Sequence, residues 1–322
     1  MTRDDSPPTI EAFAVYHMTI PSDATPPTID PTAAARWHLA APASSPWLHE
    51  EVARRMEQRL QWIKLRPQAW CHWDAVRGGL QAHELVRRHY PKAQVYVHET
   101  AAQRATAAQR ALRPGVLSPA RWLASAQHFQ VPPDSSVQML WANMALHLSA
   151  QPQQLLARWH RALATDGFLM FSCLGPDTAR ELREVYRDQG WPASGHEFTD
   201  MHDWGDMLMQ AGFAEPVMDM ERIVLTYDSP DRLLSELRSL GRNLHPARFP
   251  GLRGRGWVQQ LERALAQKLT QADGARLGLT FEVIYGHALK PAPRSPVRDS
   301  TSVSLQEMRA ALARGNKLSR GL

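Results

Sequence analysis

The chain has 322 residues, 43% of them hydrophobic and 21% charged, a composition typical of a globular protein with room for one large α/β domain or two smaller ones. Its formal charge of +5, from 37 Lys and Arg against 32 Asp and Glu, predicts a solvated surface and no nucleic-acid partner, because no arginine-rich run is interleaved with aromatic residues. Two cysteines without a Cys-x-x-Cys pair, and histidines without a His-Glu-x-x-His pattern, predict neither a disulfide framework nor a metal site.

The first half of the chain alternates strand-like and helix-like segments. Residues 1–30 are rich in Pro, Thr and Asp and predict a disordered arm. Segment 48–60 has an apolar residue at every fourth position, which predicts a helix. Strands are then expected at 69–73, 94–98, 121–124, 137–141 and 167–173, and helices at 80–89, 101–112 and 153–163. This alternation predicts a doubly wound, mostly parallel sheet of the Rossmann-like type.

The rhythm changes after Cys173. Helices are expected at 178–188 and 203–211, and a strand at 217–227. Two further helices, at 231–240 and 257–269, precede a last strand at 279–289. Residues 291–322 form a predicted basic, flexible tail with one short helix at 306–313.

Two absences bear on where the protein works. No apolar run reaches the ~18 residues that a membrane span needs. The first eight residues, Met-Thr-Arg-Asp-Asp-Ser-Pro-Pro, contain no apolar signal core. We therefore expect a cytoplasmic protein without a membrane partner.

Two places are candidates for holding a nucleoside cofactor. In open α/β sheets, ligands bind beyond the carboxyl ends of the strands, near the point where the strand order reverses. The loop 72–79 follows the first expected strand, and Glu99 ends the second. A carboxylate at Glu99 can accept hydrogen bonds from both hydroxyls of a ribose. The alternative interpretation is a solvated carboxylate at the end of a strand.

The loop departs from what a nucleoside needs. A nucleoside can approach the backbone closely only where side chains are absent. Gly78 and Gly79 meet this requirement, whereas Asp74 and Val76 do not. Val76 is β-branched and resists a positive φ. Asp74 would repel an amino-acid carboxylate or attract a sulfonium or ammonium group, and the sequence leaves the sign of its effect open.

A family resemblance is carried by motifs spread along the chain. They include Trp-Ala-Asn-Met-Ala-Leu-His at 141–147, Leu-Gly-Pro-Asp-Thr at 174–178 and Thr-Phe-Glu-Val-Ile-Tyr-Gly-His-Ala at 280–288. The full set of matching segments is 48–56, 63–67, 141–147, 166–178, 181–183, 200–203, 211–213, 216–220 and 280–288. Together they resemble the malonyl-[acyl-carrier protein] O-methyltransferases of biotin synthesis, a family of class I S-adenosylmethionine-dependent methyltransferases. The resemblance covers roughly residues 31–290.

The resemblance implies both a fold and an activity. The implied fold is a seven-stranded, mostly parallel sheet with an antiparallel last strand. It forms a methyltransferase-like domain at 31–290, with a helical lid inserted at 231–271. The implied activity is methyl transfer from S-adenosylmethionine to the carboxylate of a malonyl thioester on an acyl carrier protein. A carboxylate is already a competent nucleophile, so positioning should dominate catalysis and no catalytic residue is assigned.

The resemblance also assigns binding residues. The strand-one motif of the family, Asp-x-Gly-x-Gly-x-Gly, falls on His72, Asp74, Val76 and Gly78, so the acid and two of the three glycines are replaced. The implied cofactor-binding positions are His72, Asp74, Gly78, Gly79, Glu99, Ala126 and Asn143, with Ala126 standing where the family has an adenine-contacting Asp. The implied substrate-binding positions are Trp37, Arg238, Arg242 and Asn243, with Arg248 a further candidate for gripping the malonyl carboxylate and Trp37-His38 standing where the family has Tyr-Asp.

These departures predict weak binding of S-adenosylmethionine and a reduced activity. Lost contacts of this kind cost roughly 1–3 kcal/mol each, so three of them weaken binding about a thousandfold. Two alternatives remain open at this point. The chain could be a catalytically inactive pseudo-methyltransferase that serves as a binding or scaffold protein. It could also be a binding module whose basic lid and tail meet an acidic carrier protein.

Overall fold

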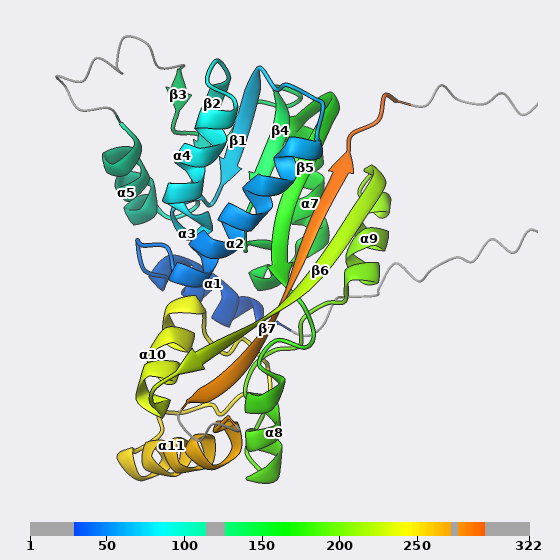
Figure 1. The fold of residues 1–322 in the computed structure, drawn as a ribbon. Coiled ribbons are helices and arrows are strands. Elements are labelled where there is room, and N and C mark those ends of the chain that lie inside the picture. The colour runs from blue at the N-terminus through cyan, green and yellow to red at the C-terminus, as the bar shows by residue number, and fades with distance from the viewer. Residues whose placement is uncertain (1–28, 114–125, 272–275, 294–322) are drawn as a thin grey trace, which may run out of the picture. The chain divides into compact units, whose positions relative to one another are not determined.

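The computed structural model describes residues 29–113, 126–271 and 276–293. The chain divides into two units, 1–290 and 291–322, and the elements below belong to the first. Their centre is a seven-stranded sheet in the order β3-β2-β1-β4-β5-β7-β6 (Figure 1). The predicted arm at 1–30 and the basic tail lie almost entirely outside the described residues.

The sheet is parallel except at one strand. β1 pairs in parallel with β2 and β4, β2 with β3, and β4 with β5, whereas β7 is antiparallel to both β5 and β6. The strand bounds are β1 Ala69–Trp73, β2 Gln94–His98, β3 Gln127–His128, β4 Val137–Ala142, β5 Leu163–Leu174, β6 Ala214–Tyr227 and β7 Leu277–Leu289. The prediction of seven strands with an antiparallel last strand is therefore confirmed.

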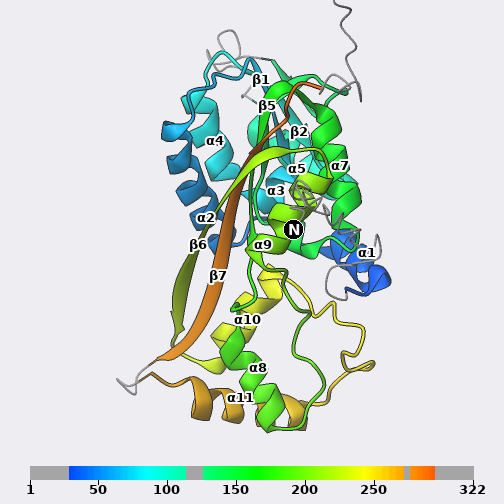
Figure 2. The same cartoon turned by 90° about the vertical axis from the view of Figure 1, so that its right-hand side faces the viewer.

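Helices cover both faces of the sheet and enclose two hydrophobic cores (Figure 2). The first core includes Val52 and Val86 and is covered by α2 Trp47–Gln58, α4 Leu80–His89 and α5 Ala102–Leu112. The second includes Trp159 and Leu208 and is covered by α7 Pro152–Ala162 and α9 Met201–Gln210. Among the described residues, no helix combines the length and the apolar character needed to cross a bilayer.

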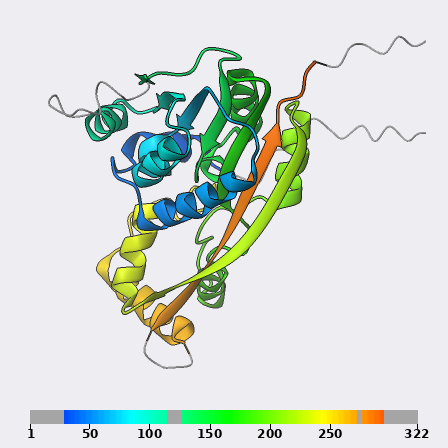
Figure 3. The ribbon, with the colours of Figure 1, turned by 45° about the horizontal axis from the view of Figure 1, so that its top comes forward.

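The lid is built on the long β6–β7 pair. These strands run beyond the rest of the sheet toward α10 Pro230–Leu240 and α11 Arg255–Leu269, which lie between them in sequence, and toward α8 Arg180–Asp188 (Figure 3). Ser229 caps α10 by accepting from the backbone N–H of Arg232 at 3.3 Å, and Pro230 occupies the first turn, where its missing N–H costs nothing. Leu233 and Leu261 are buried and join the first core. The helical insert is therefore present, as predicted.

One strand lies at a different position from the predicted one, and four helical elements were not predicted. The third strand is β3, whereas the predicted position at 121–124 lies outside the described residues. The unpredicted elements are α1 Pro31–Ala40, η1 Arg59–Trp62, α3 Ala75–Gly78 and η2 Leu146–Leu148. Helix α1 begins because Asp30 accepts from the backbone N–H groups of Thr32 and Ala33, at 2.8 and 3.2 Å.

Candidate active site

The loop after β1 folds into a single turn of helix, α3. Asp74 precedes it with φ of 50° and ψ of 53°, a left-handed conformation that Asp tolerates better than most residues. Gly79 ends the turn with φ of 112°, and a Cβ there would lie 2.8 Å from Oε2 of Glu50. Glu50 in turn accepts from the first backbone N–H groups of α4, those of Gln81 and Ala82. Gly79 thus serves the packing of α2 against the start of α4.

The expectation that Val76 obstructs the nucleoside was wrong. Its side chain is fully buried and belongs to the first core, because the α3 turn points residue 76 inward. Its backbone N–H points the other way, toward the carboxylate of Glu99, at 2.5 Å. Of the two residues that replace glycines, Asp74 and Val76, only Asp74 lines the cavity described below.

His72 and Gly78 lie behind this loop. His72 is fully buried, and its Nδ1 is 3.0 Å from Nδ1 of His83, with the two rings stacked at a centroid distance of 5.3 Å. Burial lowers the pKa of both imidazoles, so both are neutral at pH 7. A Cβ at Gly78 would lie 3.0 Å from Nε2 of His72. The sequence assigned His72 and Gly78 to cofactor contact, but the structure uses them to pack the loop onto α4.

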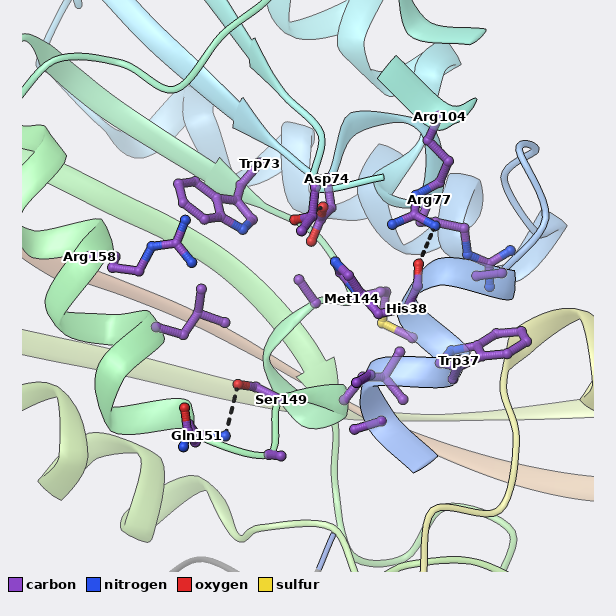
Figure 4. A pocket seen from close by; sticks show the side chains of 18 of the residues that line it. Trp37, His38, Trp73, Asp74, Arg77, Arg104, Met144, Ser149, Gln151 and Arg158 are labelled. Carbon is purple, nitrogen blue, oxygen red and sulfur yellow. Dashed lines mark hydrogen bonds between the residues drawn. The ribbon is translucent and has the colours of Figure 1, made fainter. Parts of the chain in front are cut away.

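A cavity of about 410 Å³ opens beyond the ends of β1 and β4 (Figure 4). Three of the predicted binding residues line it together, namely Trp37 from α1, Asp74 after β1 and Asn143 after β4. Trp73 and three cationic side chains, those of Arg77, Arg104 and Arg158, complete the walls used below. Asp74 is the single carboxylate among the described residues that line this cavity.

Glu99 lies beside this cavity and is already bonded. Its Oε2 pairs with Nε of Arg104 at 3.2 Å, and both side chains are only 1% exposed. The guanidinium of Arg104 also donates to the backbone carbonyl of His38 in α1, at 2.6 Å. Burial and the nearby Asp74 raise the pKa of Glu99 to about 7. A ribose would therefore meet a carboxylate whose oxygens are engaged by Arg104 and by the Val76 backbone.

Of the two remaining predicted cofactor positions, Asn143 forms structural hydrogen bonds, whereas Ala126 lies apart from the cavities. The amide of Asn143 donates to the carbonyls of His49 and Gly78, at 2.8 and 2.6 Å, and accepts from the hydroxyl of Ser172 at 2.6 Å. This ties the end of β4 to α2 and to the loop after β1. Ala126 is exposed and does not line the 410 Å³ cavity. It also does not line a separate cavity of about 170 Å³ whose walls include Glu99.

A second cavity of about 250 Å³ lies beneath the lid. Arg238, Arg242 and Asn243 line it, as the resemblance implied, together with Arg183, which the sequence analysis missed. Asn243 holds its turn by donating to the carbonyl of Ala193 at 2.6 Å.

Arg248 lies elsewhere. Its guanidinium pairs with the carboxylate of Asp30 at 2.8 Å, and it does not line the cavity beneath the lid. It therefore anchors the start of α1, and its candidacy for the malonyl carboxylate is not supported.

The two cavities are adjacent. His49 and Leu148 line both of them. Trp37 is flanked at the same place by the guanidinium groups of Arg242 and Arg77, at 5.0 and 5.7 Å from its ring centroid. Sequence reasoning missed Arg77 because it stands in no pattern that signals a ligand. His49 and Arg183 were missed although they lie within segments that carry the family resemblance, 48–56 and 181–183, and those segments were the available signal.

A sheet in this order, with helices on both faces and a cavity at the ends of β1 and β4, defines a Rossmann-like methyltransferase. A family model described as a methyltransferase domain matches residues 75–171. The fold is also similar to that of BH2331 from Bacillus halodurans C-125, which is provisionally assigned as a methyltransferase. The TM-score is 0.50 at 15% identity, covering 75% of this chain and 100% of that one.

Sequence relatives narrow the class. The chain is 41% identical to a malonyl-[acyl-carrier protein] O-methyltransferase of Laribacter hongkongensis over 254 residues, which are 77% of this chain and 84% of the relative. It is 39% identical to the protein of the same name from Gallionella capsiferriformans over 259 residues, 77% of this chain and 85% of that one. The chain therefore belongs to the malonyl-[acyl-carrier protein] O-methyltransferase family.

Proposed function

We propose that this protein transfers a methyl group from S-adenosylmethionine to the free carboxylate of a malonyl thioester on an acyl carrier protein. One observation carries the proposal: the cavity at the strand ends and the cavity beneath the lid are adjacent and share His49 and Leu148 as lining residues. A methyl donor in the first cavity and an acyl group in the second would bring the reacting groups together at this junction.

The larger cavity fits the methyl donor. Its volume of about 410 Å³ falls within the range of roughly 300–1,000 Å³ that is usual for small-molecule sites. Trp37 and Trp73 offer apolar walls for a nucleoside. Asp74 is the one carboxylate among the described residues lining this cavity, which supports attraction of the sulfonium and ammonium groups of the donor over repulsion of its carboxylate. Bound S-adenosylmethionine supplies an electrophilic methyl group.

The second cavity fits the acyl group. Arg183, Arg238 and Arg242 line it, and a planar guanidinium is well suited to hold a carboxylate through paired hydrogen bonds. Its remaining walls are mostly apolar and include Leu237 and Phe281. These residues would orient the malonyl carboxylate and remove water from it, which is what a nucleophile that needs no base requires.

Mass spectrometry of the acyl carrier protein tests the proposed reaction. Purified protein, S-adenosylmethionine and malonyl-acyl carrier protein should yield a carrier whose mass has increased by one methyl group. Acetyl-acyl carrier protein, which lacks the free carboxylate, should stay unchanged. Absence of the ester from a protein that binds both ligands would contradict the activity and favour the scaffold alternative.

Donor affinity needs a separate measurement. We propose that it is weak, because a ribose must replace Arg104 at the carboxylate of Glu99, where the two side chains are 3.2 Å apart and buried. Titration calorimetry with S-adenosylhomocysteine tests this. A dissociation constant in the low micromolar range would show that the Glu99–Arg104 pair does not limit binding.

A further inference from the structure

The junction of the two cavities contains one imidazole. His49 lies on α2, is 1% exposed and lines both cavities. Its backbone is fixed, because its carbonyl accepts from Nδ2 of Asn143 at 2.8 Å. If the proposed function holds, the methyl group passes between the two cavities. The imidazole of His49 then lies beside the methyl group during its transfer.

A hydrogen bond determines which ring nitrogen carries the proton. Nδ1 of His49 lies 2.8 Å from the carbonyl oxygen of Arg77. A carbonyl oxygen can only accept, so Nδ1 is the donor and Nε2 of the neutral ring presents a lone pair. Nε2 has no hydrogen-bond partner among the described residues. It is also not one of the fully buried nitrogen atoms that lack a partner, which include Nε2 of His72 and of His83. Burial and the charge of Arg77 lower the pKa of His49 to about 3, so the ring stays neutral.

We propose that Nε2 of His49 faces the methylsulfonium group and makes the site prefer S-adenosylmethionine over its demethylated product. The inference rests on the proposed function. A lone pair attracts the polarised C–H groups of a methyl attached to a positive sulfur. It offers nothing comparable to the neutral thioether of S-adenosylhomocysteine. His49 is then a specificity-determining residue that favours release of the product after each transfer.

The positive charge of Arg77 also favours a neutral acceptor at Nε2 of His49. Arg77 lines the 410 Å³ cavity at the strand ends, and its positive charge repels the sulfonium of a bound donor. A protonated imidazole at the junction would add to that repulsion, whereas a neutral acceptor offsets part of it. The fixed Nδ1–H donor to the Arg77 carbonyl guarantees the acceptor form on the cavity side.

Two variants separate the acceptor from the structural bond. In His49→Asn, the side-chain amide can replace Nδ1 and donate to the Arg77 carbonyl, but it leaves nothing at the position of Nε2. In His49→Gln, the longer side chain can place its carbonyl oxygen near that position. We expect His49→Asn to bind S-adenosylhomocysteine as the wild type does and to lose about two- to fivefold of its preference for S-adenosylmethionine. His49→Gln should restore part of that preference.

Calorimetry of both ligands, without acyl substrate, measures this ratio of dissociation constants. A merely structural role would weaken both ligands equally and leave the ratio unchanged, which would overturn the inference alone. Failure of the wild type to bind either ligand would overturn the proposed function together with the inference. If the variants do not fold, ¹⁵N spectra of wild-type histidine serve instead. The Nε2 resonance of His49 should move on addition of S-adenosylmethionine more than with S-adenosylhomocysteine, and equal movement would contradict the proposal.

Discussion

Nη2 of Arg77 lies 2.7 Å from the carbonyl oxygen of Ser239 and joins the loop after β1 to the carboxyl end of lid helix α10. The same guanidinium donates to the carbonyls of Leu240 and Ser44, both at 3.1 Å. Carbonyls at the end of a helix carry partial negative charge, so this buried cation is held by peptide dipoles. Arg77, which lines the larger cavity, is thereby tied to Leu240, which lines the cavity beneath the lid.

Replacing Arg77 with Lys should loosen the lid. A single ammonium group cannot reach Ser44, Ser239 and Leu240 at once, and hydrogen bonds from charged groups contribute roughly 1.5–3 kcal/mol each. We expect Arg77→Lys to lower the free energy of unfolding by about 2–4 kcal/mol in urea denaturation. Arg87→Lys is the matched control, because Arg87 pairs with Glu84 on a partly exposed helix face and should change stability by less than about 1 kcal/mol. Equal midpoints for the two variants would contradict the link.

The Glu99–Arg104 pair should show strong coupling. Removing one partner of a buried ion pair leaves an uncompensated charge, which costs roughly 3–5 kcal/mol. We expect this cost for Arg104→Met in chemical denaturation at about pH 9, where Glu99, with its pKa of about 7, is ionised in the wild type. The double variant Arg104→Met/Glu99→Gln should lose at least ~1 kcal/mol less than the sum of the two single changes. Additive losses would mean that the two side chains do not interact in solution.

The pKa of Glu99 predicts a pH dependence of stability. Burial and Asp74 raise this pKa to about 7 from its ordinary value of 4.5, so the folded state binds the proton more tightly than the unfolded state does. The resulting stabilisation is complete below the unfolded pKa and is lost as the pH rises through 7. The melting temperature of the wild type should therefore fall between pH 5 and 8 relative to that of Glu99→Gln. Parallel curves for the two proteins would rule out this titration.

Asp74 should favour the charged methyl donor. It is the single carboxylate among the described residues lining a cavity that also contains three arginines. Asp74→Asn removes the negative charge while keeping the size of the side chain. We expect the affinity for S-adenosylmethionine to fall about tenfold, as an interaction of ~1.4 kcal/mol implies. Calorimetry measures the change, and tighter binding by Asp74→Asn would show that repulsion of the donor's carboxylate dominates instead.

The arginines of the second cavity should act on the acyl substrate. Arg242 lines that cavity and flanks Trp37, so Arg242→Ala should raise KM for malonyl-acyl carrier protein by about tenfold or more, the effect of losing a charged hydrogen bond. Its effect on donor affinity should be small. Arg232→Ala is the control, because Arg232 is exposed on α10, just before Arg242 in the chain, and does not line the cavity. A KM equal to that of this control would exclude Arg242 from substrate binding.

The regular elements followed from local patterns. β1 and β2 lie at the residues predicted for them, because short apolar or β-branched runs bounded by turn residues leave few alternatives. The α3 turn was missed because a four-residue helix has no periodicity to detect. Helix α1 carried a capping signal in Asp30-Pro31, but it stands in a proline-rich stretch that indicates a loop. The inward direction of Val76 depends on α2 and α4 packing against it, which the loop sequence alone does not show.

The sequence by itself determined the alternation of strands and helices, the helical insert and the family, since each depends on the order of residue types along the chain. Only the tertiary structure decided which side chains share a cavity. His49, Arg77 and Arg104 come from segments far apart from their hydrogen-bond partners Asn143, Ser239 and His38. Their contacts arise because packing of the sheet, α1 and the lid brings distant backbone groups within hydrogen-bond reach, and no local pattern encodes such a meeting.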